Sequence, residues 1–134
     1  MNNIRLSNYD PFFDEDKEFR RYVKEVIKNI HKEYPSLIEQ AQEIIDNSHL
    51  KGIKIIDATL SGSYERGDPT PDSDIDIRFI YTGYPINQEW WDKDEDTLRS
   101  EIAMTLAGNI VGNFGSYDAH AVRDTIKNKK GGIE

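Results

Sequence analysis

The N-terminal third of the chain has the spacing of apolar residues that is typical of amphipathic helices. Between residues 14 and 34 they recur every three or four positions, as one face of a helix requires: Phe19, Tyr22, Val23, Val26, Ile27 and Ile30. Pro35 disfavours a helical conformation in the residue before it, so the pattern predicts that this helix ends at Tyr34. A second helix is expected from Ser36 to Asn47, and the two helices would cover a sheet.

Beyond Gly52 the pattern changes to that of strands, loops and one further helix. The segment from residue 62 to 72 contains Pro69 and Pro71, which predict a loop, with a short helical turn at 63–66. Strands are predicted at 53–61, 74–82 and 116–122, and a helix at 97–111. The connection between the second strand and this helix holds Trp90 and Trp91, which we expect to be packing residues. These elements predict an α+β fold.

The size of the chain predicts a single domain. Its 134 residues suffice for one hydrophobic core but leave little room for a second. We therefore expect one domain over residues 1–134, with an N-terminal arm (1–13), a helical cover (14–50), a core that carries the chemistry (53–123) and a tail (127–134).

The charge balance narrows the class of function. With 17 basic and 25 acidic residues the formal net charge is −8, which argues against general nucleic-acid binding. The chain has no cysteine, so disulfides and thiolate metal sites are excluded. The sequence shows neither a signal peptide nor an apolar stretch of membrane-spanning length, and a cytoplasmic location is expected.

An acidic pair stands out in the second predicted strand. Residues two apart in a strand share a face, so Asp74, Asp76 and Arg78 line one face and Ile75 and Ile77 the other. Neighbouring carboxylates repel each other, and a hard divalent cation with oxygen ligands relieves that repulsion. The alternative reading is a half-exposed edge strand with solvated acids.

A phosphate-binding turn is predicted where the first strand ends. At Gly62 a backbone without a Cβ allows close approach of an anion, and N–H groups in such a turn can cradle phosphate. The hydroxyl of Ser63 and the guanidinium of Arg66 would add donors. Alternatively, glycine and serine serve only the conformation of the turn.

A third carboxylate would complete a two-metal site, and Asp118 is the best candidate. If the third strand pairs beside the second, Asp118 would meet Asp74 and Asp76; otherwise it is an ordinary exposed acid. Asp57 is a competitor from the first strand, and Asp124 lies close to the polar tail. His120 shares the face of Asp118 and is expected to satisfy a neighbour rather than to polarise a substrate.

These residues together resemble the DNA polymerase β-type nucleotidyltransferase superfamily. Leu60–Ser63, ten intervening residues and Asp74–Ile77 match its pattern of a hydrophobic residue, Gly-Ser, a spacer and Asp-hydrophobic-Asp-hydrophobic. The longer strings Gly62–Gly67 and Pro71–Asp76 are similar to the minimal nucleotidyltransferases (MNT type) in particular. The resemblance implies a short mixed β-sheet flanked by helices.

The resemblance also implies the roles of the site residues. Gly62 and Ser63 would bind the phosphates of a nucleoside triphosphate, and Asp74 and Asp76 would bind Mg²⁺. Asp118 would be the third metal-binding acid, near the position of the general base. Glu65 departs from the family pattern by adding negative charge to the loop, and Ala119 makes the third acidic motif weak.

The function expected from this resemblance is Mg²⁺-dependent transfer of a nucleoside monophosphate, most plausibly AMP from ATP, to an acceptor hydroxyl. The acceptor would be held by a partner subunit or a second copy, or would itself be a protein, as where small family members act as antitoxins on a toxin of the HEPN type. The main alternative is a nucleotidyltransferase-like protein that binds a nucleotide or partner without catalysis. A small-molecule adenylyltransferase of the aminoglycoside type fits less well, because the chain lacks a C-terminal helical domain.

Overall fold

The computed structural model describes residues 15–87 and 94–125. The expected N-terminal arm, the two tryptophans of the connection and the expected tail lie outside the described residues. Within the described ranges, no helix is both long and apolar enough to cross a lipid bilayer.

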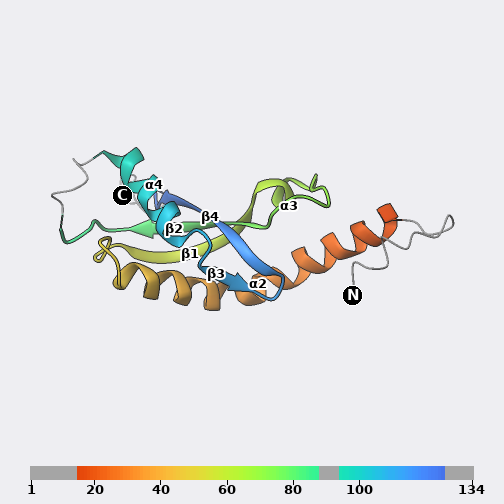
Figure 1. Ribbon diagram of the computed structural model, residues 1–134, viewed down its shortest axis with the longest axis horizontal. Helices are drawn as coiled ribbons and strands as arrows, with labels where there is room; N and C mark the ends of the chain where they lie inside the picture. Colours follow the sequence, from red (N-terminus) through yellow and green to blue (C-terminus); the bar gives the residue numbers. More distant parts are fainter. Residues whose placement is uncertain (1–14, 88–93, 126–134) are drawn as a thin grey trace, which may run out of the picture.

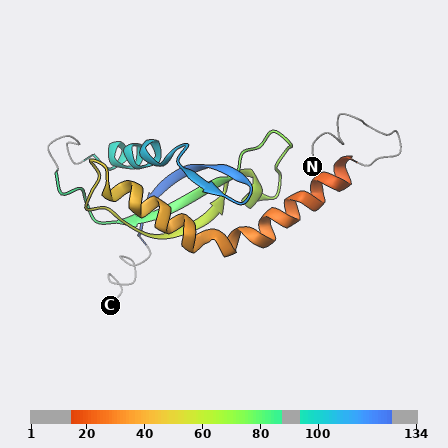
Figure 2. The ribbon, with the colours of Figure 1, turned by 60° about the horizontal axis from the view of Figure 1, so that its bottom comes forward.

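One long helix, α2 (Glu15–Asp46), replaces the two helices expected from the sequence. The prediction of a break at Pro35 was wrong, because the helix continues through this residue. Its buried positions keep the helical spacing across the proline, since Ile30, Glu33 and Leu37 are all buried. Packing of this continuous stripe outweighs the loss of one backbone hydrogen bond at Pro35. Figure 1 shows the first turns of α2 extending past the strands, and Figure 2 shows the bend of the helix along them.

A four-stranded mixed sheet forms the other layer of the fold. Its strands are β1 (Lys54–Ser61), β2 (Asp76–Thr82), β3 (Ile110–Gly112) and β4 (Gly115–Arg123). The order across the sheet is β1-β2-β4-β3, and the central pair β2 and β4 is parallel, whereas the other two pairs are antiparallel. This arrangement confirms the expected α+β class with a mixed sheet, and it meets the condition set for Asp118, since the third predicted strand pairs beside the second.

The segment before β4 differs from the expectation of one helix over residues 97–111. Helix α4 (Glu95–Leu106) ends earlier, and Gly108 adopts a left-handed φ of 76° in the turn that follows. Ile110, four residues after Leu106, continues the helical spacing in the sequence but lies buried in the edge strand β3. The spacing of apolar residues could not distinguish a helix that continues to Ile110 from a helix that ends earlier and is followed by a strand. The pairing of β3 with β4, which decides between them, is a tertiary contact.

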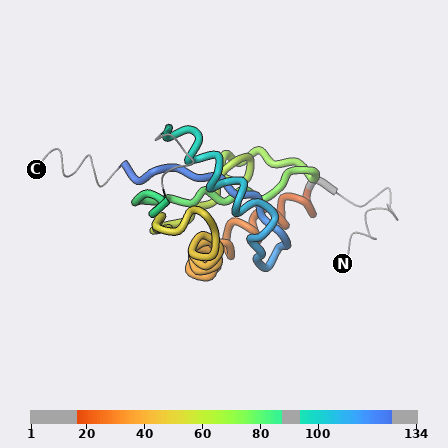
Figure 3. Tube along the Cα trace, turned by 60° about the vertical axis from the view of Figure 1, so that its left-hand side comes forward, coloured from red at the N-terminus to blue at the C-terminus, as the bar shows by residue number. Residues whose placement is uncertain are grey.

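Both long helices pack on the same face of the sheet. Helix α2 packs against β1, α4 packs against β4, and the two helices touch each other. In the two central strands the residues that face them are buried: Ile77, Phe79, Tyr81, Tyr117, Ala119 and Ala121. The alternating residues Arg78 and His120 are exposed, so neither helix covers the opposite face. Figure 3 shows the C-terminal part of α2 nearly end-on below the strands and α4 crossing in front of them.

Candidate active site

The ends of three strands bring the candidate site together. Ser61, at the end of β1, pairs with Asp76 at the start of β2, and Asp76 pairs with Asp118 in β4. The backbone N–H of Asp118 donates to the carbonyl of Ile75 at 2.9 Å, which fixes this parallel register. Asp76 and Asp118 therefore stand side by side on the face that the helices leave open.

Asp74 lies just before β2 and not within it, which differs from the strand start expected at this residue. The pKa of the Asp118 carboxyl is nevertheless raised above its ordinary value by partial burial and then by the charges of Asp74 and Asp76. Contact with the Asp74 side chain adds to this effect, while His120 lowers the pKa. The tertiary structure thus brings the three acids together.

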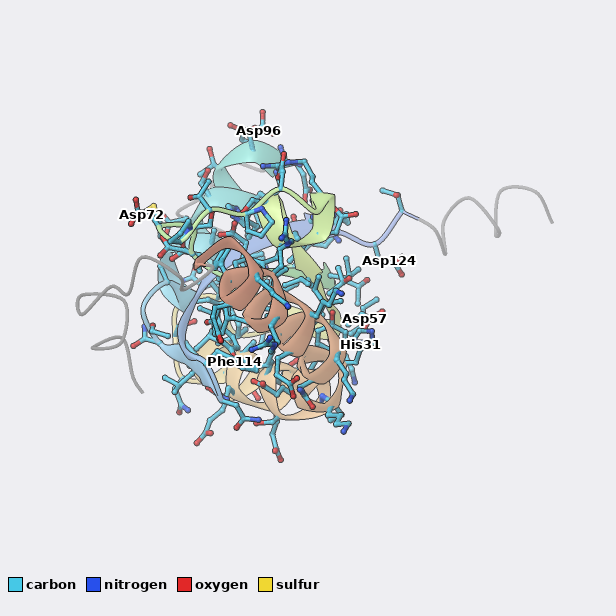
Figure 4. All side chains as sticks on the ribbon, turned by 90° about the vertical axis from the view of Figure 1, so that its right-hand side faces the viewer. His31, Asp57, Asp72, Asp96, Phe114 and Asp124 are labelled. Atoms are coloured by element: carbon cyan, nitrogen blue, oxygen red, sulfur yellow. The ribbon has the colours of Figure 1, made fainter. Side chains whose placement is uncertain are left out.

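The two competing acids lie elsewhere. Asp57 pairs with Ile80, four residues further along β2 than Asp76, and its side chain accepts a hydrogen bond from the N–H of Ala58. Asp124 follows the end of β4, where its N–H donates to the carbonyl of Tyr81. Figure 4 shows Asp57 and Asp72, an acid of the loop before β2, on opposite sides of the ribbon. Asp118 is thus the acid that the sheet places beside Asp74 and Asp76.

The turn after β1 forms the second part of the site. Residues 62–66 form the short helix α3 (Gly62–Arg66), in agreement with the expected helical turn. Gly62 has a left-handed φ of 70°, and a Cβ at this position would lie 2.2 Å from Oδ2 of Asp76. Glycine is therefore required both for the turn and for the close approach of the acid.

The predicted donors of this turn differ in their surroundings. Ser61 precedes α3 as its N-cap but provides no side-chain hydrogen bond to it, so the side chain does not occupy the first N–H groups of α3. Ser63 is partly exposed beside them. Arg66 is exposed, and its Nε lies 3.5 Å from Oδ1 of Asp68. This ion pair lies at the surface, so a phosphate could take the place of the Asp68 carboxylate.

Two residues around the acids were not assigned a role in the site from the sequence. Tyr64 of α3 is buried, and burial raises the pKa of its hydroxyl to about 12, with further contributions from Tyr22 and Asp74. His120 was expected to satisfy a neighbour, and its Nε2 lies 3.4 Å from Oδ1 of Asp76. An aromatic residue in the middle of the predicted turn was the available signal for Tyr64, but its contacts come from α2 and the segment before β2.

The acids have the chemistry of a site for a hard cation. Their ligand atoms are all carboxylate oxygens, and the mutual repulsion that raises the pKa of Asp118 is relieved by a divalent cation. Within the described residues, however, no three side chains of the ligand-forming types already converge on one point. The donor set thus fits Mg²⁺ by the type of its ligand atoms, and binding would require the three carboxylates to come closer together.

Comparison with known families matches the part of the chain that contains the acidic pair. Residues 38–102, slightly less than half of the chain, match the model of the nucleotidyltransferase domain. This match supports the DNA polymerase β-type nucleotidyltransferase superfamily as the source of the motifs. The resemblance drawn from the motifs is thereby confirmed. No curated protein and no solved structure matches the chain.

The match to the nucleotidyltransferase domain covers only some of the candidate site residues. Gly62, Ser63, Asp74 and Asp76 lie within the matched residues, whereas Asp118 and the whole of β4 lie beyond them. The place of Asp118 therefore rests on the register of β2 and β4 and not on the family match.

Proposed function

We propose that the protein is a Mg²⁺-dependent nucleotidyltransferase that moves AMP from ATP to an acceptor hydroxyl. The observation that carries this proposal is the pairing of Asp76 with Asp118, beside the turn at Gly62. It puts a third carboxylate next to the acidic motif of a nucleotidyltransferase domain, as two-metal transfer of a nucleotide requires.

In this proposal the chain holds the donor from two sides. The backbone N–H groups of Gly62 and Ser63, together with the side chains of Ser63 and Arg66, bind the triphosphate. Asp74, Asp76 and Asp118 hold Mg²⁺, which supplies charge neutralisation for the phosphates when it is bound. Catalysis then rests on in-line positioning of the reactants and on electrostatic stabilisation.

The reaction forms one phosphorus–oxygen bond and breaks another. The acceptor oxygen attacks the α-phosphorus of ATP, and the bond from that phosphorus to the oxygen bridging to the β-phosphorus breaks. Pyrophosphate leaves with the bonding electron pair, and the carboxylate of Asp118 accepts the proton of the acceptor hydroxyl. The products are the adenylylated acceptor and pyrophosphate.

Transfer from α-labelled ATP tests the proposal. The label is expected to appear on an acceptor, either a protein from a native pull-down or a small hydroxylated molecule, with release of pyrophosphate that depends on Mg²⁺. The double variant Asp74→Asn/Asp76→Asn is expected to lose transfer by at least about 1,000-fold while it keeps the fold. Asp57→Asn is the matched control, since this acid lies on the same open face but away from Asp76, and its transfer should be unchanged. Equal transfer in all three proteins would refute the proposal.

One observation favours a second function, in which the protein binds a nucleotide or a partner, as an antitoxin or a sensor, without catalysis. The three carboxylates do not converge on one point in the described part of the chain, and the exposed Glu65 adds negative charge to α3. This alternative predicts nucleotide or partner binding that survives in Asp74→Asn/Asp76→Asn, with no covalent label on any protein or small molecule.

A further inference from the structure

The open face of the sheet carries a second polar row next to the acids. Thr59 pairs with Arg78, and Arg78 pairs with His120, so these three residues form a row across β1, β2 and β4. We call them the Arg78 row. They lie two residues from the corresponding members of the acid row, Ser61, Asp76 and Asp118, and therefore share their face of the sheet.

The side chains of the Arg78 row are available to a ligand. Arg78 is exposed, and within residues 15–87 and 94–125 no ion pair or hydrogen bond occupies its guanidinium. The His120 side chain is 60% exposed and touches Asp76 at its Nε2. Thr59 is partly exposed, and its hydroxyl lies 3.5 Å from the carbonyl of Leu60, at the limit of a hydrogen bond. Neither α2 nor α4 packs on this face.

The Arg78 row lies on the opposite side of the acids from the phosphate-binding turn. Strand β1 runs from Thr59 through Ser61 into Gly62, so the turn continues beyond the acid row while Thr59 precedes it. In β2, Arg78 lies two residues further into the strand than Asp76, a separation of about 6–7 Å along the sheet. A donor held by the turn thus leaves the Arg78 row to the other reactant.

We infer that the Arg78 row binds an anionic group on the acceptor, a phosphate or a carboxylate, while the acceptor hydroxyl reaches the acid row. This inference rests on the proposed function and names the class of its acceptor. A planar guanidinium is suited to both oxyanions, and the Thr59 hydroxyl and the His120 ring add donors on either side. Arg78 then determines specificity and takes no part in the chemical step.

The charge of the chain limits how large this acceptor is. One arginine with one histidine, in a protein of net charge −8, neutralises a single anionic group and not a polyanion. The acceptor expected from the row is therefore a small hydroxylated molecule with one phosphate or carboxylate, not a nucleic acid.

A matched set of probes tests the inference. Glycerol, glycerate and glycerol 3-phosphate share a hydroxylated three-carbon skeleton and differ in their anionic group. Binding of each is measured at 0.15 M NaCl by NMR, from the shifts of the Arg78 Nε and His120 ring signals, for the wild type, Arg78→Gln and Arg20→Gln. Arg20 is an exposed arginine of α2 away from the sheet and serves as the control. Mg²⁺-ATP affinity is titrated separately in each protein.

The expected result is saturable binding of glycerol 3-phosphate, glycerate or both, at least about tenfold tighter than that of glycerol. Arg78→Gln should remove most of this preference and leave Mg²⁺-ATP affinity within about twofold, and Arg20→Gln should change neither. The two anions separate the phosphate from the carboxylate as the group recognised.

Three outcomes would overturn the inference: equal binding of glycerol and both anions, an unchanged preference in Arg78→Gln, or a loss of Mg²⁺-ATP affinity in Arg78→Gln, which would assign the row to the donor. Failure of the proposed function has a different signature. In that case the wild type transfers no label from α-labelled ATP to any acceptor, whatever the three probes do.

Discussion

Asp76 and Asp118 are direct partners across the parallel strands β2 and β4, although 41 residues separate them along the chain. The backbone hydrogen bond from Asp118 to the carbonyl of Ile75 holds them in this register. Because the period of a strand is two, a shift of one residue would turn Asp118 into the core. The register of one strand pair therefore decides whether the third acid belongs to the site.

The raised pKa of Asp118 predicts a pH-dependent gain in stability from removal of its charge. A carboxyl whose pKa is higher in the folded protein than in the unfolded chain contributes stability at low pH and loses it as the pH rises through the folded pKa. At pH 7 the ionised Asp118 is therefore destabilising, and Asp118→Asn should increase the free energy of unfolding, by no more than about 1 kcal/mol because solvent screens the charges.

The stability gained in Asp118→Asn should decrease as the pH falls through the raised pKa of Asp118, and it should be absent below the ordinary value of 3.8. Urea unfolding of the wild type and Asp118→Asn between pH 3 and 8 measures it. Asp57→Asn is the control and should show no comparable pH-dependent difference. A gain that grows toward low pH would contradict the electrostatic explanation.

Addition of Mg²⁺ should reverse the order of stability of these two proteins. A cation held by Asp74, Asp76 and Asp118 stabilises the folded state by mass action, and the Asn variant lacks one ligand. In 10 mM MgCl₂ the Tm of the wild type should rise by about 2–4 °C relative to NaCl of equal ionic strength, with a smaller rise in Asp118→Asn. Chelation with EDTA should abolish the difference in differential scanning calorimetry, and equal rises in both proteins would exclude Asp118 from the metal site.

The glycines at the two ends of α3 allow a controlled test of the close approach at the site. Gly62 and Gly67 both have left-handed φ angles, but a Cβ on Gly62 would meet Asp76, whereas a Cβ on Gly67 would have no atom within 4 Å. Both alanine variants should lose about 1–2 kcal/mol from backbone strain. Gly62→Ala should lose more, and it alone should weaken Mg²⁺-ATP binding, by at least about tenfold, as measured by calorimetric titration. Equal effects of the two substitutions would show that the contact with Asp76 is unimportant.

The buried carboxylate of Glu33 forms hydrogen bonds to the hairpin of β3 and β4, and β4 carries Asp118. The hydroxyl of Tyr117 donates to Oε1 of Glu33 at 2.8 Å and accepts from the N–H of Phe114 at 3.1 Å. Oε1 also accepts from the N–H of Asn113, whereas Oε2 is buried without a partner. Tyr117→Phe removes the shared hydroxyl and leaves the partly buried N–H of Phe114 unpaired, so it should cost about 1–3 kcal/mol in urea unfolding.

Because Tyr117 adjoins Asp118, the same variant should also weaken Mg²⁺ binding. Ser116→Ala removes an exposed hydroxyl from the preceding residue of β4 and should stay within about 0.5 kcal/mol of the wild type. An effect of Tyr117→Phe no larger than that of Ser116→Ala would contradict the role of this hydrogen-bond network.

The sequence by itself determined the features that depend on neighbouring residues. The alternation from Ile75 to Tyr81, the helical turn after Gly62 and the acidic motif follow from local periodicity and backbone preference, and they carried the resemblance to the superfamily that the family match supports. The break expected at Pro35 was wrong because the local preference of proline against a helix interior was outweighed by packing of a continuous buried stripe.

Only the tertiary structure decided which residues from distant segments meet. The edge strand β3, the pairing of Asp118 with Asp76 and the burial of Tyr64 beside Tyr22 and Asp74 are contacts between such segments. The packing of α2 and α4 on one face, which leaves Arg78 and His120 exposed beside the acids, is of the same kind. The spacing of residues within a segment determines the face on which a side chain lies. Which residue of another segment lies beside it depends on strand order and register, and these are set when the whole core packs.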